Sequence, residues 1–250
     1  MQRDELVRYL DEKLGIHDID DVSVNGLQVE GSNQVDKVAL ITDAALSLFQ
    51  KARAAGCDMI IAHHGIVWGG LKRITGPIRK QLKLLMDSNI NLYAAHLPLD
   101  AHPTLGNNAQ LARIAKLTDV EPFGKYHGAH IGVSGRLTSP STIEQLARTW
   151  QETIGGEPVV LPFGAPEIET VGIVSGGGSS ALAEAIAKGL DCFVTGEGRH
   201  ENHHTALEAG INMILLGHYH SETAGVKAVG RDIEEQFGIE TIFIDEPTIL

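Results

Sequence analysis

Histidine is the residue type in this sequence whose number and placement point most directly to chemistry. The 250 residues include 12 histidines but only 2 cysteines, Cys57 and Cys192. Two cysteines so far apart can form neither a disulfide framework nor a thiolate zinc site. We therefore expect any metal ion in this protein to be bound by imidazole and carboxylate groups.

Side chains with metal-binding or acid–base chemistry follow strand-like apolar segments at several points of the chain. They are His63, His64, His96, Asp100, His102, Glu197, His218 and Glu222. In open α/β sheets, ligands bind at the carboxyl ends of the strands, where such side chains converge. A single histidine is usually a satisfied or solvated side chain, but the joint pattern predicts a site at this edge.

The adjacent histidines of this set suggest two ions rather than one. His63 and His64 would point to opposite faces of a strand. At a strand end, where the chain turns at Gly65, they could instead bind two neighbouring ions. Asp100 and Glu222 supply carboxylates that can bridge such a pair, and two ions about 3.5–4 Å apart form a recurrent hydrolytic arrangement. The donor set suits Zn, Mn, Fe, Ni or Co and does not choose among them.

Hydrophobic periodicity predicts the elements that must position these residues. Strands are expected at 37–42, 58–62, 91–95, 131–137 and 158–161, and helices at 2–14, 44–55, 77–88 and 141–154. Ser141-Thr-Ile-Glu144 matches a capping box at the start of the last helix, and a helix beginning near Ser221 would place Glu222 one turn from His218. Strand–helix alternation of this kind predicts an α/β fold with helix-covered, largely parallel sheets.

The strand–helix unit occurs twice. Residues 37–43 match residues 170–176 at an offset of 133, which also carries Asp58 onto Asp191, and residues 91–96 match 212–217 at an offset of 121. Convergence of two buried βαβ units is one explanation, but the matched order of elements favours duplication. We expect two interlinked lobes, one comprising residues 1–124 and 212–250 and the other residues 125–211.

Composition limits the classes of protein to consider. The hydrophobic fraction is 43%, which excludes a disordered chain, and the net charge of −12 makes nucleic-acid binding unfavourable. Neither a secretory signal nor a stretch of about 20 apolar residues is found, so we expect a soluble cytoplasmic protein.

One segment is basic although the chain as a whole has a negative net charge. Residues 71–83 contain five cations and no acid. A solvated helix face or a subunit contact is the default interpretation. Our hypothesis is that Lys72 and Arg73 contact the phosphates of a nucleotide whose base lies at the metal ions.

Two other motifs have weaker functional interpretations. His200, His203 and His204 have the spacing of a metal site on a helix face, but a solvated helix start with only His204 turned inward is favoured. The glycine-rich loop 175–180 could bind a phosphate, but it lacks the lysine of a P-loop. We expect a plain turn in which a serine caps the next helix.

Several motifs together resemble the NIF-three-like family, whose members are often labelled GTP cyclohydrolase 1 type 2 homologues. They are, in order, Asn25-Gly-Leu-Gln-Val-Glu-Gly31, Ala62-His-His-Gly65, His96-Leu-Pro-Leu-Asp-Ala-His-Pro103 with Gly106-Asn-Asn108, Thr195-Gly-Glu197 and Gly217-His-Tyr-His-Ser-Glu222. The resemblance spans nearly the whole chain and corresponds to the short form, without an inserted domain. It implies a fold of two interlinked α/β lobes.

The resemblance also implies a dinuclear metal site in a toroidal hexamer. His64 and Asp100 would bind one ion, His63 and His218 the other, and Glu222 would bridge both. Matching positions place His96, Glu197 and His204 around the ions. Tyr219-His220 departs from the family pattern and leaves the role of His220 open.

Two functions are compatible with these expectations. One is a metal-dependent hydrolase acting on a nucleotide, with Asp100 or Glu222 orienting the attacking hydroxide and His96 as general acid or base. The family label points to C8 of guanine, although small amides and phosphoesters fit the same ligands. The alternative is a non-enzymatic metal-binding scaffold or metallochaperone.

Overall fold

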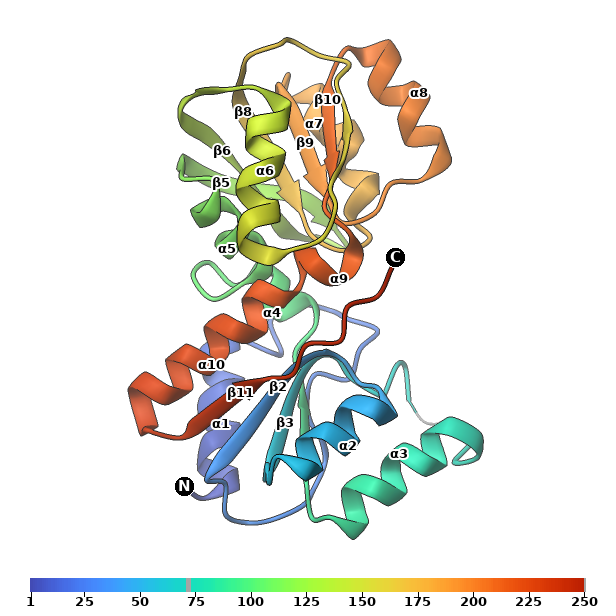
Figure 1. Cartoon of the computed structure of the whole chain (residues 1–250), viewed down its shortest axis with the longest axis vertical. Coiled ribbons are helices and arrows are strands. Elements are labelled where there is room, and N and C mark those ends of the chain that lie inside the picture. Colours follow the sequence, from blue (N-terminus) through green and yellow to red (C-terminus); the bar gives the residue numbers. More distant parts are fainter. Residues whose placement is uncertain (71–72, 250) are drawn as a thin grey trace. The chain divides into compact units, whose positions relative to one another are not determined.

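A computed structural model of the chain describes residues 1–70 and 73–249 (Figure 1). The chain divides into two compact units, residues 1–99 with 226–246 and residues 100–225 with 247–250. The predicted lobe boundaries, after 124 and before 212, both fall inside the second of these units. Among the described residues, no helix is long and apolar enough to cross a membrane.

The first unit is built on a five-stranded sheet with strand order β1-β4-β3-β2-β11. All neighbouring strands are parallel except β1, which runs antiparallel to β4. The strands are β1 (Gly26–Val29), β2 (Lys37–Asp43), β3 (Met59–His64), β4 (Asn91–Ala94) and β11 (Glu240–Phe243).

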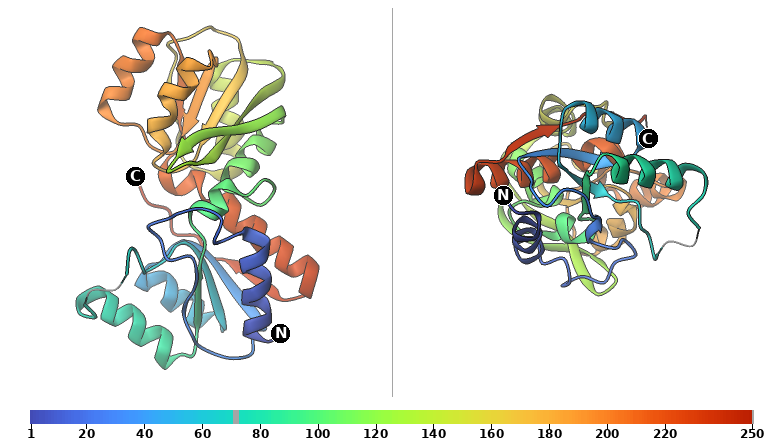
Figure 2. Two further views of the ribbon diagram at one scale, coloured as in Figure 1. Left: turned by 180° about the vertical axis from the view of Figure 1, so that it is seen from behind. Right: turned by 90° about the horizontal axis from the view of Figure 1, so that it is seen from below.

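Helices cover both faces of this sheet, with α2 and α3 on one face and α1 and α10 on the other (Figures 1 and 2). They are α1 (Arg3–Leu14), α2 (Leu46–Ala54), α3 (Gly76–Asp87) and α10 (Thr223–Phe237), while the short helix α4 (Leu97–Ala101) follows β4. Apolar residues of α2 and α3 pack on alternate residues of β3, such as Ile60 and Ala62. Burial on both faces explains why the central strands read as continuous apolar runs.

The second unit contains a six-stranded mixed sheet with strand order β5-β6-β8-β9-β10-β7. Strands β8, β9 and β10 are parallel, and the other pairs are antiparallel. The strands are β5 (Leu117–Tyr126), β6 (Ala129–Ser141), β7 (Val159–Leu161), β8 (Ile168–Val174), β9 (Cys192–Thr195) and β10 (Asn212–Leu215).

Two separate apolar clusters hold the helices of the second unit on opposite faces of its sheet. Cys192 and Val194 of β9 face the cluster with α5 and α6, whereas Phe193 between them faces α7 and α8. The helical segments are α5 (Asn107–Ile114), α6 (Ile143–Ile154), the 3-10 turn η1 (Gly178–Ala181), α7 (Leu182–Ala187), α8 (His200–Ala209) and α9 (His218–Ser221).

The predicted α/β class is confirmed, and the predicted strands and helices lie within a few residues of their expected positions. Strands β1 and β5 and helix α5 were not predicted, and the second sheet is mixed rather than largely parallel. The capping box of α6 is formed by Thr142 and Gln145, one residue later than predicted. Both registers match the motif, but burial of Ile143, Leu146 and Trp150 on the sheet fixes which one forms. Similarly, a short helix begins at His218, earlier than predicted, and Glu222 ends it.

The two matched strand–helix units share a polar brace at the amino ends of their strands. The carboxylate of Asp58 accepts from the backbone N–H groups of residues 36 and 37, at 2.9 and 3.1 Å. Asp191, its counterpart at the offset of 133, accepts from those of residues 169 and 170, at 3.1 and 2.8 Å. The same contact therefore occurs at corresponding places in both units, as duplication predicts.

The asparagines at the next strand start extend this brace. Asn91 is fully buried, accepts from the N–H of residue 31 and donates to the carbonyls of residues 32 and 58. Asn212 is also buried, accepts from the N–H of residue 164 and donates to the carbonyl of residue 165. In each unit one amide ties a neighbouring loop to the sheet.

We expect Asn91→Ala and Asn212→Ala each to lower the free energy of unfolding by about 1–3 kcal/mol, because each leaves buried backbone groups without a partner. Urea denaturation monitored by circular dichroism measures this. Asn33→Ala, at an exposed position, is the matched control and should change stability by less than about 0.5 kcal/mol. Equal effects of the three variants would contradict the brace.

Candidate metal centre

Three histidines of the first unit lie together at the carboxyl ends of β3 and β4. His63 and His64 end β3, and His96 follows β4. Their ring centroids are 4.6 Å apart for His63 and His64, 5.3 Å for His63 and His96, and 5.5 Å for His64 and His96. One ring nitrogen from each lies within 4.8 Å of the others. This spacing would allow the three rings to surround one or two small cations.

Fixed acceptors orient the two β3 histidines. The Nδ1 of His63 donates to the carbonyl of Ala95 at 2.9 Å, and the Nδ1 of His64 donates to the carboxylate of Asp43 at 2.7 Å. A carbonyl can only accept, so the neutral ring of His63 carries its lone pair on Nε2, and the Asp43 carboxylate imposes the same tautomer on His64. Metal-binding histidines are typically oriented in this way, by donation of the other ring nitrogen.

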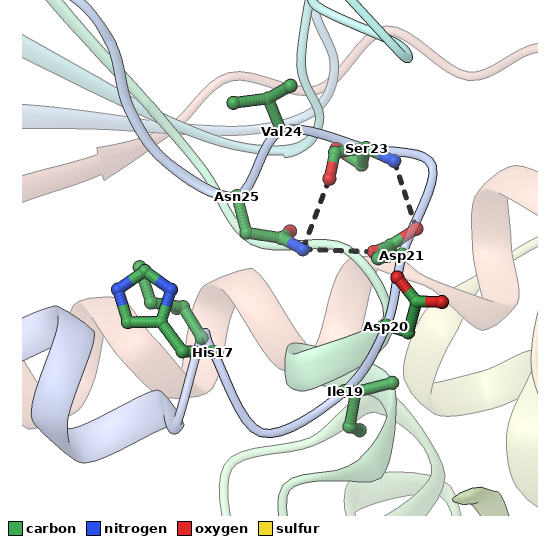
Figure 3. Close-up of a pocket in the computed structure, with 8 residues that line it drawn as sticks. His17, Ile19, Asp20, Asp21, Ser23, Val24 and Asn25 are labelled. Carbon is green, nitrogen blue, oxygen red and sulfur yellow. Dashed lines mark hydrogen bonds between the residues drawn. The ribbon is translucent and has the colours of Figure 1, made fainter. Parts of the chain in front are cut away.

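The third histidine is held by Asp21, which sequence reasoning missed. Both carboxylate oxygens of Asp21 lie 3.0 Å from the Nδ1 of His96, and its side chain is only 2% exposed. Asp21 also accepts from the side chain of Asn25 and the backbone N–H of Ser23 (Figure 3). The amide oxygen of Asn25 in turn accepts from the backbone N–H of His96 at 2.8 Å.

This network controls the charge of Asp21. Burial by itself would raise the pKa of Asp21, but the hydrogen bonds from His96 and Asn25, the charge of His96 and the N–H of Ser23 outweigh it. Together they hold the pKa of this carboxyl far below its usual range. Asp21 is therefore ionised at neutral pH and keeps the proton of His96 on Nδ1.

A second group of ligand-type residues belongs to the second unit, around α9. The Nε2 of His218 lies 3.1 Å from the carboxylate of Glu222, and its Nδ1 lies 2.6 Å from that of Glu197. The hydrogen bond to Glu222 raises the pKa of His218 to about 9, helped by the charge of Glu222 and by Glu197, and opposed by burial. Without a metal ion, His218 is thus an imidazolium between two carboxylates.

Asp100 lies in the same group. It is 5% exposed and accepts from the side-chain amide of Asn107 at 2.9 Å and the hydroxyl of Ser175 at 3.0 Å. One of its carboxylate oxygens lies within 4.8 Å of one from Glu222. Such a carboxylate pair is costly to bury without compensating positive charge.

The glycine-rich loop 175–180 supports these carboxylates. The expected serine cap is not formed, because Gly177 precedes the turn η1 and Ser175 bonds Asp100 instead. Gly176 has a φ of 57°, and a Cβ on it would collide with the carboxylate of Glu222. The positive φ and the lack of room for a Cβ both require glycine at this position. The loop thus packs directly against Glu222, a candidate ligand.

The remaining motif histidines are used differently. The Nδ1 of His102 accepts from the backbone N–H of Leu105 at 2.9 Å, which closes a local turn. His220 packs with its ring against Gly156.

All three histidines of α8 are exposed, so the expectation that His204 turns inward is wrong. The helix buries Asn202 and Ala206, four residues apart, and His204 lies outside that stripe. Sequence periodicity was weak here because the helix has only this narrow buried face.

The thiols and the basic segment add no ligand to either group. Both cysteines are buried, and burial raises the pKa of Cys57 to about 11 and that of Cys192 further still. Neither is a thiolate at neutral pH. Arg73 is exposed, and Lys72 lies outside the described residues.

Within their units, the structure brings together His63, His64 and His96, and likewise Asp100, His218 and Glu222 with Glu197. Histidine and carboxylate groups arranged in this way could hold divalent metal ions. The orientation of the rings fits a metal, because every candidate histidine ligand has its Nδ1 bonded to an acceptor.

Comparisons with known proteins show which family this chain belongs to. The family model described as Duf34/NIF3 (NGG1p interacting factor 3) matches residues 1–248. A relative from Pyrococcus horikoshii, named GTP cyclohydrolase 1 type 2 homolog, is 46% identical over 99% of both chains. The crystal structure of TTHA1606 from Thermus thermophilus superposes with a TM-score of 0.91 at 43% identity and covers 100% of both chains. A structure titled protein ybgI, unknown function, gives 0.92 at 36% identity over 99% of both.

We expect Asp43→Ala to weaken divalent metal binding about 10–100-fold, because His64 loses the acceptor that fixes its tautomer. Competition with a chromophoric chelator measures this affinity. Asp20→Ala removes an exposed carboxylate with no such contact and is the matched control. Equal affinities of the two variants would show that Asp43 does not support a metal ligand.

The titration of His218 is a second prediction, for the metal-free protein. NMR of its ring protons should give a pKa near 9, and Glu222→Gln should lower it towards the ordinary 6.5. The folded-state pKa is raised, so this interaction stabilises the protein fully below pH 6.5 and is lost as pH rises through 9. Glu208→Gln, an exposed control on α8, should leave it unchanged. A wild-type value near 6.5 would contradict the pairing with Glu222.

Proposed function

Because the chain belongs to the Duf34/NIF3 (NGG1p interacting factor 3) family, we propose that it binds two divalent metal ions and acts as a metal-dependent hydrolase on a nucleotide or related small molecule. The observation that carries the metal proposal is the hydrogen bond from Nδ1 of each candidate histidine ligand to a fixed acceptor. The nucleotide is suggested by the relatives' name, GTP cyclohydrolase 1 type 2 homolog.

In this proposal five residues bind the ions. His64 and Asp100 bind one ion, His63 and His218 bind the other, and Glu222 bridges both. Buried Asp100 and Glu222 carboxylates, close together, are the charges that two cations would neutralise.

Divalent ions at these residues would supply Lewis acidity and bring the pKa of water towards neutrality. The chain's own residues would do the rest of the chemistry. His96, its Nδ1 proton fixed by Asp21, would accept a proton at Nε2 and return it to the leaving group. Asp21 would stabilise the imidazolium formed between these steps, and Glu222 would orient the attacking oxygen.

The basic segment supports a nucleotide as substrate. Arg73 is exposed, and Lys80 of α3 lines a cavity of about 460 Å³ together with Ala44, which directly follows Asp43. We propose that Lys72 and Arg73 contact the phosphates. If a Lys72→Ala/Arg73→Ala double variant kept the affinity and turnover of the wild type for a nucleotide, the proposed phosphate contacts would be contradicted.

Assembly and location also remain proposals. By family resemblance we propose a homohexameric ring in the cytoplasm. A light-scattering mass different from six chains would contradict the ring.

The test combines metal analysis with a hydrolysis screen. We expect about two equivalents of metal after reconstitution, and turnover of at least one nucleotide with the identified metal. Glu222→Gln should lower that turnover by at least about 100-fold with the fold intact, whereas Glu208→Gln should not.

The outcomes separate the alternatives. Two equivalents of metal without turnover of any compound would favour a metal-binding scaffold or metallochaperone. Less than one equivalent after careful reconstitution would contradict both functions.

A further inference from the structure

Trp68 is a large aromatic side chain that the fold leaves exposed. It lies in the loop after β3 and is 40% exposed, whereas Trp150, the other tryptophan, is fully buried in the second unit. A buried tryptophan contributes much to a core, so an exposed one beside ligand-type residues calls for an explanation.

The exposed position of Trp68 is built into the fold. Its Nε1 donates to the carbonyl of Gly65 at 2.9 Å, which fixes the ring against its own loop. The segments 22–24 and 67–69 are joined by two backbone hydrogen bonds, of 3.0 and 2.7 Å, with Trp68 opposite Ser23 in an antiparallel bridge. The indole is therefore anchored at both its ring nitrogen and its backbone.

The indole flanks two of the three histidines of the first unit, His64 and His96. Its centroid lies 5.0 Å from that of His96, edge-on at 72°, and 6.1 Å from that of His64 at 43°. Gly69 and Gly70 then take positive φ angles of 61° and 108°, and turn the chain directly after the indole. Part of the aromatic surface thus stays exposed beside the nitrogens proposed to bind the ions and move the proton.

We infer that Trp68 is the substrate-binding residue that recognises a planar heteroaromatic ring. Stacked on the exposed indole, such a ring would present an edge atom to His96 and to the proposed ions. The chemistry at that atom rests on the proposed function, but the binding does not. A stacking surface gives no advantage to a small aliphatic amide or a phosphoester without a ring, so Trp68 selects the heterocycle among the candidate substrates.

The test is binding of guanosine 5′-monophosphate to the metal-reconstituted protein by calorimetry, with ribose 5-phosphate as the ring-free probe. Trp68→Leu should weaken binding of the nucleotide roughly 10–100-fold, and leave that of ribose 5-phosphate unchanged. Trp68→Phe should retain most of the affinity, because it keeps an aromatic face. Tyr126→Leu removes an exposed aromatic ring of the second unit and is the matched control.

Fluorescence gives an independent readout of stacking. Excited near 300 nm, where the nucleotide absorbs only weakly, and after inner-filter correction, the protein should lose emission on adding the nucleotide, and this loss should be absent in Trp68→Leu. Trp150, fully buried, should contribute a constant background in both proteins.

Three results would overturn the inference. The first is that wild type and Trp68→Leu bind the nucleotide with equal affinity at equal metal content. The second is that neither protein binds the nucleotide. The third is that Trp68→Leu changes the mass of the assembly but leaves the nucleotide affinity unchanged. The last would assign the indole to a contact between chains.

Failure of the proposed function gives a different pattern. Trp68-dependent nucleotide binding without turnover of any compound would remove the hydrolase and keep the ring site. Turnover of a nucleotide whose binding does not depend on Trp68 would keep the hydrolase and remove the ring site.

Discussion

The hydrogen bond from Nδ1 of each site histidine to a fixed acceptor is the interaction on which the candidate centre depends. It decides which ring nitrogen carries the lone pair, and so whether a histidine can serve as ligand or base. The acceptors come from the carbonyl of Ala95 and from Asp43, Asp21 and Glu197. Asp43, Ala95 and Glu197 lie at or just after strand ends, whereas Asp21 comes from the loop before β1.

The candidate histidines of both units were predictable from sequence, but the groups that orient them were not. His63, His64, His96 and His218 could be found because each follows a strand-like apolar run, a purely local pattern. Asp21 lies 75 residues before His96 and follows no strand, so only the folded chain reveals their pairing. The α/β class and the repeat were likewise readable, since burial on both sheet faces makes the strands apolar throughout.

Two errors of sequence reasoning have a common cause. The capping box of α6 and the orientation of His204 both depended on the rotational register of a helix against its sheet. Local motifs allow more than one register, and packing of the buried stripe selects one of them. The serine cap expected in the loop 175–180 failed for a different reason, because Ser175 bonds Asp100, 75 residues away in the sequence.

The loops 21–25 and 65–70 show how a small pairing can serve several roles. One short antiparallel bridge places Asp21 and Asn25 against His96 and anchors Trp68 beside it. The acid that orients the base and the indole that would bind a ring are thus fixed by the same backbone contacts. A change in this bridge would be expected to alter proton transfer and recognition together.

The duplicated brace has a consequence for how this architecture can change over time. Asp58 and Asp191, with Asn91 and Asn212, tie loops to the amino ends of the strands, whereas the site residues occupy the carboxyl ends. At those ends the two matched units differ, with His63 and His64 in one and Gly196 and Glu197 in the other. Structural integrity and chemistry are therefore encoded at opposite edges of each sheet. Such a separation lets new reactivity arise by exchange of the residues at one edge, while the other preserves the fold.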